Sequence, residues 1–233
     1  MFTLPKNQMT FMETLIAIFL CWKSLILPLL PLSILCVFLT ALPAFGIKLS
    51  YLAPRSHVFF IVYAISYALY LIPSGAIIML ISSALHGKKI DLVEALRIGV
   101  SRFPKMLMTG IILIVAMYIL VRFGLLFSHI SYYLGIIIAF LLIVATSPFL
   151  IPASPLVVID NKWPFDAITS GVRLVKTNWL RVFGIMAVIS VITIPLNVFT
   201  AHFMAAAFIV SVLTLPLTLS MTVVITENLK LKP

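Results

Sequence analysis

The sequence predicts an all-α, polytopic membrane protein with six transmembrane helices in three hairpins, each preceded by an amphipathic cytoplasmic helix at the membrane interface. Hydrophobic residues make up 63% of the 233 residues and charged residues only 9%, so polar side chains could not cover a water-exposed surface. Six apolar runs reach or approach the roughly 20 residues that a helix needs to cross a bilayer. Between these runs lie polar segments whose apolar residues recur at helical spacing.

The first part of the chain predicts one interfacial helix and two spans. Residues 1–23 mix apolar and polar side chains, which indicates a helix lying at the interface. Residues 24–47 form the first span, and we expect it to be kinked or broken because three prolines interrupt it. Residues 58–85 form a second span that is longer than a crossing requires, so we expect it to tilt, to kink near Pro73 or to emerge at one end.

The middle part repeats this order. Residues 86–105 carry a polar sequence with an apolar stripe, which predicts a second amphipathic helix. Residues 106–121 form the third span and residues 130–159 the fourth. Three prolines in the later half of the fourth run indicate that this half is not a straight continuation of the helix.

The last part contains the clearest amphipathic segment, residues 160–183. Pro164 suits the first turn of a helix, where its missing N–H costs nothing, and Asp166 places negative charge near the positive end of the helix dipole. Residues 180–199 and 203–225 predict the fifth and sixth spans, and a short charged tail ends the chain. We expect the amphipathic segment to lie on the membrane surface.

An internal repeat relates these parts. A shift of 72 residues places the EAL sequence at 94–96 over DAI at 166–168, and the GV pair at 99–100 over that at 171–172. The pattern predicts a single membrane domain, residues 1–233, built from one unit used three times. The possible repeat units are residues 1–85, 86–159 and 160–233.

The distribution of basic residues predicts the orientation in the membrane. Thirteen of the 16 Lys and Arg residues fall in the termini and the two long polar segments, against three in the other connections. This bias places both termini and both polar segments in the cytoplasm. The same topology explains the net charge of +10 without a nucleic-acid partner, because no basic face of a soluble domain exists.

Basic residues beside the cytoplasmic leaflet attract anionic lipids, at about 1 kcal/mol for each residue close to the surface. Anionic membrane lipids are therefore the expected partners, together with a possible membrane-protein partner. The residues that we expect to contact lipid headgroups are Lys88, Lys89, Arg97, Arg102, Lys105, Lys162, Arg173, Lys176 and Arg181.

Catalytic chemistry is not indicated. The sequence contains no phosphate-binding glycine loop, nucleophile elbow or paired catalytic carboxylates. It also places no ionisable residue in the middle of a predicted span, where transporters and pumps usually carry one. We therefore expect a protein that is not an enzyme and needs no cofactor.

Three histidines offer a weaker hypothesis of a metal site. His57, His129 and His202 recur at intervals of 72 and 73 residues and fall in the connections predicted on the outer face. Three imidazoles could hold Zn²⁺ or Cu²⁺ if the repeat brought them together. Interfacial histidines without a special role are the more common alternative, so no metal site is assigned.

The chain from about Val58 to the C-terminus includes a span ending in proline, an acidic-basic pair and a helix containing Ser and Arg. The residues that form this pattern are Pro155, Val158, Asp160, Lys162, Ser170, Arg173, Leu174 and Asn178. In these features this part of the chain resembles the YciC-type family of bacterial inner-membrane proteins. The resemblance implies a six-span inner-membrane protein without an assigned activity. The chain is more distantly similar to the membrane region fused to some glycerophosphodiester phosphodiesterases, whose catalytic domain it lacks.

These features together favour a non-catalytic inner-membrane protein that acts in envelope or lipid homeostasis, by binding lipid or organising a partner. Two alternatives remain open. The proline-rich spans could line the path of a permease for a small or lipid-like solute, or the chain could be a subunit of a larger membrane assembly.

Overall fold

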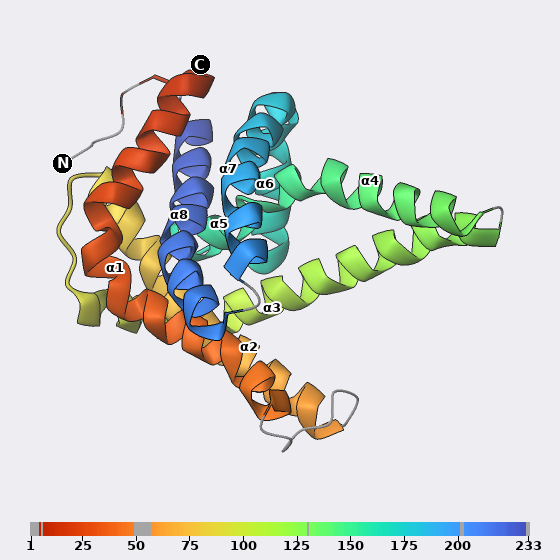
Figure 1. The fold of residues 1–233 in the computed structure, drawn as a ribbon. Coiled ribbons are helices and arrows are strands. Elements are labelled where there is room, and N and C mark those ends of the chain that lie inside the picture. The colour runs from red at the N-terminus through yellow and green to blue at the C-terminus, as the bar shows by residue number, and fades with distance from the viewer. Residues whose placement is uncertain (1–4, 6, 49–56, 130, 201–202, 232–233) are drawn as a thin grey trace.

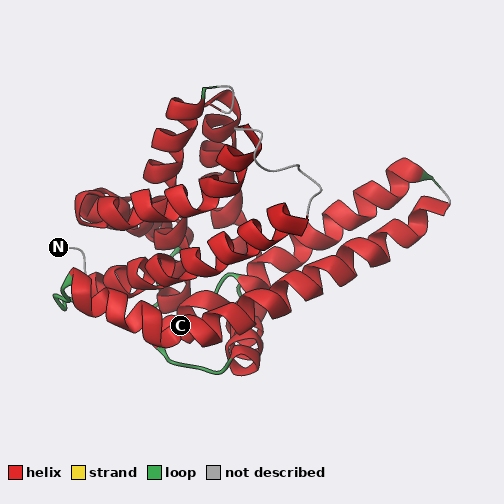
Figure 2. Cartoon of the chain, turned by 90° about the horizontal axis from the view of Figure 1, so that it is seen from below, coloured by secondary structure: helices red, strands yellow, loops and turns green. Residues whose placement is uncertain are grey.

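The computed structural model describes residues 5, 7–48, 57–129, 131–200 and 203–231. These residues form eight α-helices and one 3-10 helix, η1 (Figure 1). The elements are α1 Phe11–Lys48, α2 His57–Leu85, α3 Leu92–Leu125, η1 Leu126–His129, α4 Tyr132–Leu150, α5 Ala153–Ile159, α6 Pro164–Lys176, α7 Trp179–Thr200 and α8 Met204–Lys230. No strand occurs among the described residues, so the predicted all-α class is confirmed for them (Figure 2).

Among the described residues, six helical stretches are long and apolar enough to cross a membrane, which confirms the predicted number of spans. They are Phe11–Pro43, His57–Leu85, Leu92–His129, Tyr132–Ile159, Trp179–Phe199 and Ala205–Lys230. Each exceeds the roughly 20 residues that a bilayer requires. The chain is therefore a multi-pass membrane protein by the length and composition of its helices.

Two of the predicted interfacial helices are not separate elements. Helix α1 runs without interruption from Phe11 through Pro28, Pro31 and Pro43, so residues 11–23 belong to the first span. Its first turns bury Ala17, Ile18 and Cys21 among neighbouring helices instead of lying on a surface. Neighbouring helices tolerate proline inside a spanning helix because they help to satisfy its freed backbone groups.

The second amphipathic segment is likewise continuous with its span. Helix α3 extends through Pro104, and residues 92–105 form its first turns. Asp91 caps this helix by accepting a hydrogen bond from the Leu92 N–H at 2.8 Å. The third segment is a helix of its own: α6 buries Ala167, Gly171 and Val175 and leaves Arg173 exposed.

The most deeply buried elements are the short helix α5 and the second half of α8. Helix α5 packs against α2, α3, α6 and α8. All its residues from Pro155 to Val158 are buried. In α8 every residue from Val223 to Leu229 is buried, including Glu227 and Asn228. The core therefore lies where α1, α2, α5 and α8 meet.

The prolines of the fourth run separate α4 from α5, as predicted. Helix α4 ends at Leu150, and α5 begins at Ala153 after the Pro152 N-cap. A proline cannot donate to the helix ladder and therefore favours a change of direction at this point. This break lets α5 lie in the core while α4 extends away from it (Figure 1).

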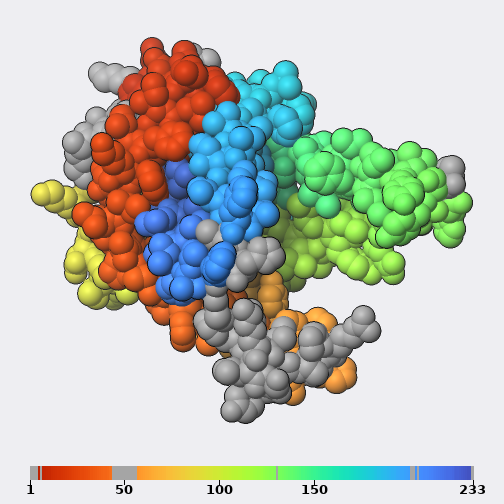
Figure 3. All heavy atoms as spheres, in the orientation of Figure 1, coloured from red at the N-terminus to blue at the C-terminus, as the bar shows by residue number. Residues whose placement is uncertain are grey.

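Helices α3 and α4, joined by η1, form an arm that protrudes from the rest of the molecule (Figures 1, 2 and 3). Helix α4 approaches α3 closely at Gly124 and η1 closely at Gly135. A Cβ added at Gly124 would lie 2.5 Å from the Cα of Ala139, and one at Gly135 would lie 2.8 Å from the N of Ser128. Small residues allow such close backbone contact between membrane helices.

Polar contacts tie the N-terminal part to the end of α8. The Asn228 side chain accepts a hydrogen bond from the Met9 N–H at 2.7 Å and donates to the Thr14 hydroxyl at 3.2 Å. Arg181 also donates to the Thr14 hydroxyl, at 3.1 Å. These bonds hold α1, α7 and α8 together at the end where α8 finishes.

Candidate anion-binding site

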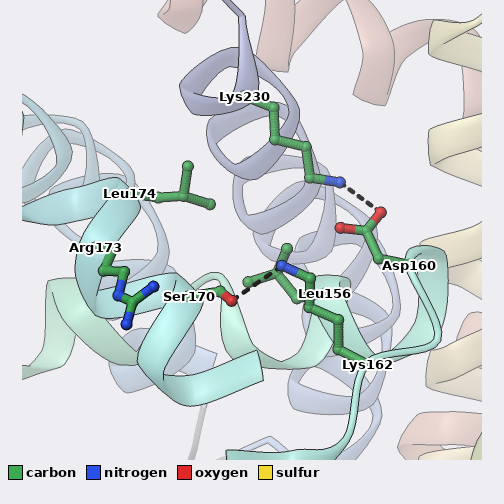
Figure 4. Close-up of a pocket in the computed structure, with 7 residues that line it drawn as sticks. All are labelled: Leu156, Asp160, Lys162, Ser170, Arg173, Leu174 and Lys230. Carbon is green, nitrogen blue, oxygen red and sulfur yellow. Dashed lines mark hydrogen bonds and ion pairs between the residues drawn. The ribbon is translucent and has the colours of Figure 1, made fainter. Parts of the chain in front are cut away.

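A pocket of about 270 Å³ lies between α5, α6 and the end of α8 (Figure 4). The residues that line it are Leu156, Asp160, Lys162, Ser170, Arg173, Leu174 and Lys230. Three of these side chains are cationic and one is anionic. Figure 4 shows the Ser170 hydroxyl pointing toward Lys162, with the Arg173 side chain on the other side of Ser170.

The chain reverses sharply between α5 and α6, and this turn positions Asp160 and Lys162. Asp160 caps α5, and Asn161 adopts a positive φ of 55°, a left-handed conformation that Asn tolerates better than most residues. The Lys162 N–H donates to the carbonyl of Leu156 at 3.4 Å. Pro164 then starts α6, at a position where its missing N–H is not needed.

Lys230 is held at one side of the pocket by two carboxylates. Its Nζ lies 2.8 Å from Asp160 Oδ1 and 2.8 Å from Glu227 Oε1. Glu227 has a side chain only 7% exposed, and its Oε2 lies 3.5 Å from Nε2 of His86. These polar contacts connect His86 after the end of α2, the α5–α6 turn and the end of α8.

Lys162 and Arg173 are not neutralised in the same way. The Lys162 ammonium donates to the neutral Ser170 hydroxyl at 3.0 Å. Among the described residues, no carboxylate lies within salt-bridge distance of either cation. Two positive charges therefore face the pocket without a salt-bridge partner, because Asp160 pairs with Lys230 instead, and an anion is the ligand that they favour.

Lys105 supports the turn from outside the pocket. Its Nζ donates to the backbone carbonyl of Asn161 at 3.0 Å and to the Asn161 side-chain oxygen at 2.7 Å. The same ammonium lies 5.2 Å from the centre of the Trp163 ring, within the range of a cation–π contact. We therefore assign Lys105 a positioning role.

The structure brings only some of the nine predicted headgroup residues together. Lys162 and Arg173 line the pocket, and Arg181 is engaged with Thr14. Arg102 is partly buried, and its Nε has no hydrogen-bond partner among the described residues. The exposed residues away from the pocket are Lys88, Lys89, Arg97 and Lys176.

Sequence reasoning missed Lys230 and the buried Glu227. Both were assigned to a short tail, but α8 continues to Lys230 and buries its last turns. The three-residue spacing of Glu227 and Lys230 was the available signal, because such a pair shares one face of a helix. The prediction of no ionisable residue in the middle of a span is not contradicted, because Glu227 lies in the last turn of α8.

The histidine hypothesis gains nothing from the described geometry. His57 begins α2 and His129 ends η1, at places that lie apart in Figure 1. His202 lies outside the described residues. No group of three His, Cys, Asp or Glu residues in the described part of the chain could hold a metal ion.

The fold and the pocket together define a multi-pass membrane protein with a basic pocket at the ends of three helices. Five residues that carry the family resemblance line this pocket: Asp160, Lys162, Ser170, Arg173 and Leu174. No family model, curated protein or solved structure matches the chain.

Proposed function

We propose that this protein is a non-catalytic membrane protein that binds the headgroup of an anionic lipid in the pocket between α5, α6 and α8. The observation that carries the proposal is the pair of cations, Lys162 and Arg173, that face one pocket without a carboxylate partner among the described residues. A lipid phosphate would accept charge-assisted hydrogen bonds from both. The role in the cell would be in envelope or lipid homeostasis.

The proposed orientation puts the pocket on the cytoplasmic face of a bacterial inner membrane, with both termini on that side. The spans would be arranged as three hairpins with α6 lying on the anionic leaflet. The excess of Lys and Arg in the segments assigned to this face supports it. Trp163 and Phe165 support it as well, because they are 60% and 66% exposed beside the pocket, and aromatic side chains favour the membrane interface.

The geometry also suggests how a headgroup would be held. Lys162 and Arg173 would bind the phosphate oxygens, and the Ser170 hydroxyl, which already contacts Lys162, would add a polar group beside them (Figure 4). Lys230 would add a weaker attraction, since Asp160 and Glu227 already neutralise it. The acyl chains would follow the apolar surface beside α6.

Lipid binding is preferred over the two alternatives for a physical reason. A permease would need polar groups that connect the two faces, whereas the charged residues of this pocket gather at the ends of helices. A subunit of a larger assembly would need an extended partner surface, whereas the charges that support this proposal line a pocket.

Native mass spectrometry of the detergent-solubilised protein with added phosphatidylglycerol tests the proposal. The double variant Lys162→Gln/Arg173→Gln should bind this lipid about 30-fold more weakly, if each cation contributes about 1.0 kcal/mol. Lys88→Gln/Lys89→Gln is the matched control, because it removes the same charge from exposed positions outside the pocket. Equal losses in the two variants would mean that diffuse surface charge, and not the pocket, attracts the lipid.

A further inference from the structure

A second pocket, of about 240 Å³, lies among the spanning helices α1, α2 and α8. Its polar lining is made almost entirely of hydroxyl groups. The residues that supply them are Thr40 from α1, Tyr70 from α2, and Ser211, Thr214 and Thr218 from α8. We call this pocket the hydroxyl groove.

The hydroxyl groove lies midway along two of the spanning helices, a position that corresponds to the hydrocarbon core if these helices cross a bilayer. Tyr70 is near the middle of α2, and Thr214 and Thr218 are near the middle of α8. Thr218 and Lys230 are 12 residues apart on α8, which corresponds to about 18 Å along a helix. The groove is therefore a separate site from the basic pocket.

The hydrogen bonds inside the groove leave acceptors unused. Thr40 donates to the Val37 carbonyl at 3.0 Å, Thr214 to the Val210 carbonyl at 2.9 Å and Thr218 to the Thr214 carbonyl at 3.1 Å. Each threonine thus uses its proton within its own helix, and its oxygen lone pairs remain available. Such bonds are common in membrane helices, but here they converge from two helices on one pocket.

Tyr70 supplies the complementary group. Its phenolic hydroxyl makes no hydrogen bond to another described residue, although it lines the same pocket. A phenol can donate one hydrogen bond and accept others. The Ser211 hydroxyl lines the pocket as well and donates to no other described residue. The groove therefore offers several acceptors and two free donors, which matches a ligand that carries an alcohol group.

Charge and access restrict the ligand further. No charged residue lines the groove, and an ionised ligand at this depth would be costly without a counter-charge. Thr40 and Thr218 are exposed on the lateral surface of the spanning helices. Leu35 and Phe38 of α1 are also exposed, 43% and 49%, and offer an apolar surface for acyl chains. A ligand that enters from the side must itself be soluble in the bilayer.

We infer that the hydroxyl groove binds a neutral lipid with a free hydroxyl group, of the diacylglycerol class. The lipid alcohol would donate to a threonine oxygen of α8 and accept from the Tyr70 phenol, while its chains lie along α1. This site needs no anionic headgroup and is independent of the proposed function of the basic pocket.

Native mass spectrometry of the full chain with added 1,2-dioctanoylglycerol tests the inference. The wild-type protein should retain this lipid, and Thr214→Val/Thr218→Val should bind it about tenfold more weakly because two hydrogen-bonding oxygens are lost. Thr222→Val is the matched control, since Thr222 lies on the same helix and donates to the Leu219 carbonyl at 2.9 Å but does not line the groove. It should bind like the wild type.

Two further variants test whether dioctanoylglycerol binds in the hydroxyl groove. Tyr70→Phe keeps the ring and removes the hydroxyl, so it should weaken binding even if the double variant does not fold. Lys162→Gln/Arg173→Gln should leave dioctanoylglycerol binding unchanged, which separates the two sites. The inference is overturned if the wild type retains no dioctanoylglycerol, or if the groove variants bind it as strongly as Thr222→Val does.

Discussion

Helices α2 and α8 differ from helices α3 and α4 in how their hydropathy relates to their burial. The relation is the reverse of that in soluble proteins, where apolar residues are the buried ones. The spans of α2 and α8 have mean hydropathies of 1.9 and 2.2, and 50% and 44% of their most apolar stretches are buried in the protein. The spans that include α3 and α4 reach 2.5 and 2.6, yet only 11% and 17% of the corresponding stretches are buried. The more apolar helices are the more exposed ones.

The difference follows from the bilayer as solvent. Lipid chains are as apolar as leucine, so exposure of Ile or Phe to them costs little. Hydroxyl and charged groups instead need partners, because an unsatisfied polar group in hydrocarbon is expensive. Such groups are buried in α2 and α8. The buried polar residues of the two helices are Ser66, Ser74, Ser82, Ser83, Ser220, Thr226, Glu227 and Asn228.

The largest loss of stability should come from disturbing the contact between α3 and α2, which joins the two regions. A Cβ added at Gly99 of α3 would lie 2.5 Å from the Ile72 carbonyl oxygen of α2, and backbone cannot move aside as a side chain can. We expect Gly99→Ala to lower the free energy of unfolding by about 3 kcal/mol. Gly110→Ala is the control, because its Cβ would meet only Tyr67, at 3.6 Å. Unfolding in mixed micelles with increasing dodecyl sulfate measures the free energy of unfolding of both variants.

A second test applies the same substitution to both regions. Ile77 of α2 is fully buried, whereas Ile119 of α3 is 60% exposed. Ile77→Ala leaves a cavity and should cost about 2 kcal/mol of unfolding free energy. Ile119→Ala should cost less than about 0.5 kcal/mol, because lipid fills the space. Similar losses in the two variants would show that the arm is packed against protein in the membrane.

The smallest loss of stability should come from removing the buried charge of Glu227 in α8. Glu227→Gln keeps the size of the side chain but removes the charge that faces Lys230 and His86. We expect a loss of about 1 kcal/mol in unfolding free energy, because a charge-assisted hydrogen bond becomes a neutral one. Glu94→Gln, at an exposed position, should change it by less than about 0.5 kcal/mol. Equal free energies of unfolding in the two variants would contradict a structural role for the contacts of Glu227 with Lys230 and His86.

The sequence predicted part of the candidate site. Lys162 and Arg173 were identified because they lie on a segment with clear amphipathic spacing, and that segment forms α6. The same reasoning selected Lys88 and Lys89, which lie elsewhere. Charge and spacing indicate which residues face the membrane surface, but they cannot distinguish a pocket from a solvated face. Lys230 was missed because the contact with Asp160 joins residues that are 70 positions apart.

The sequence by itself determined the helical class, the number of membrane-spanning helices and the break before α5. These features depend on local quantities: the length of an apolar run, its hydropathy and the missing N–H of proline. Only the tertiary structure decided which helices are buried and which side chains share a pocket. In a bilayer almost every span is apolar on all sides, so the choice of buried face depends on close contacts such as that of Gly99 and on polar groups such as Glu227 that need partners from other helices.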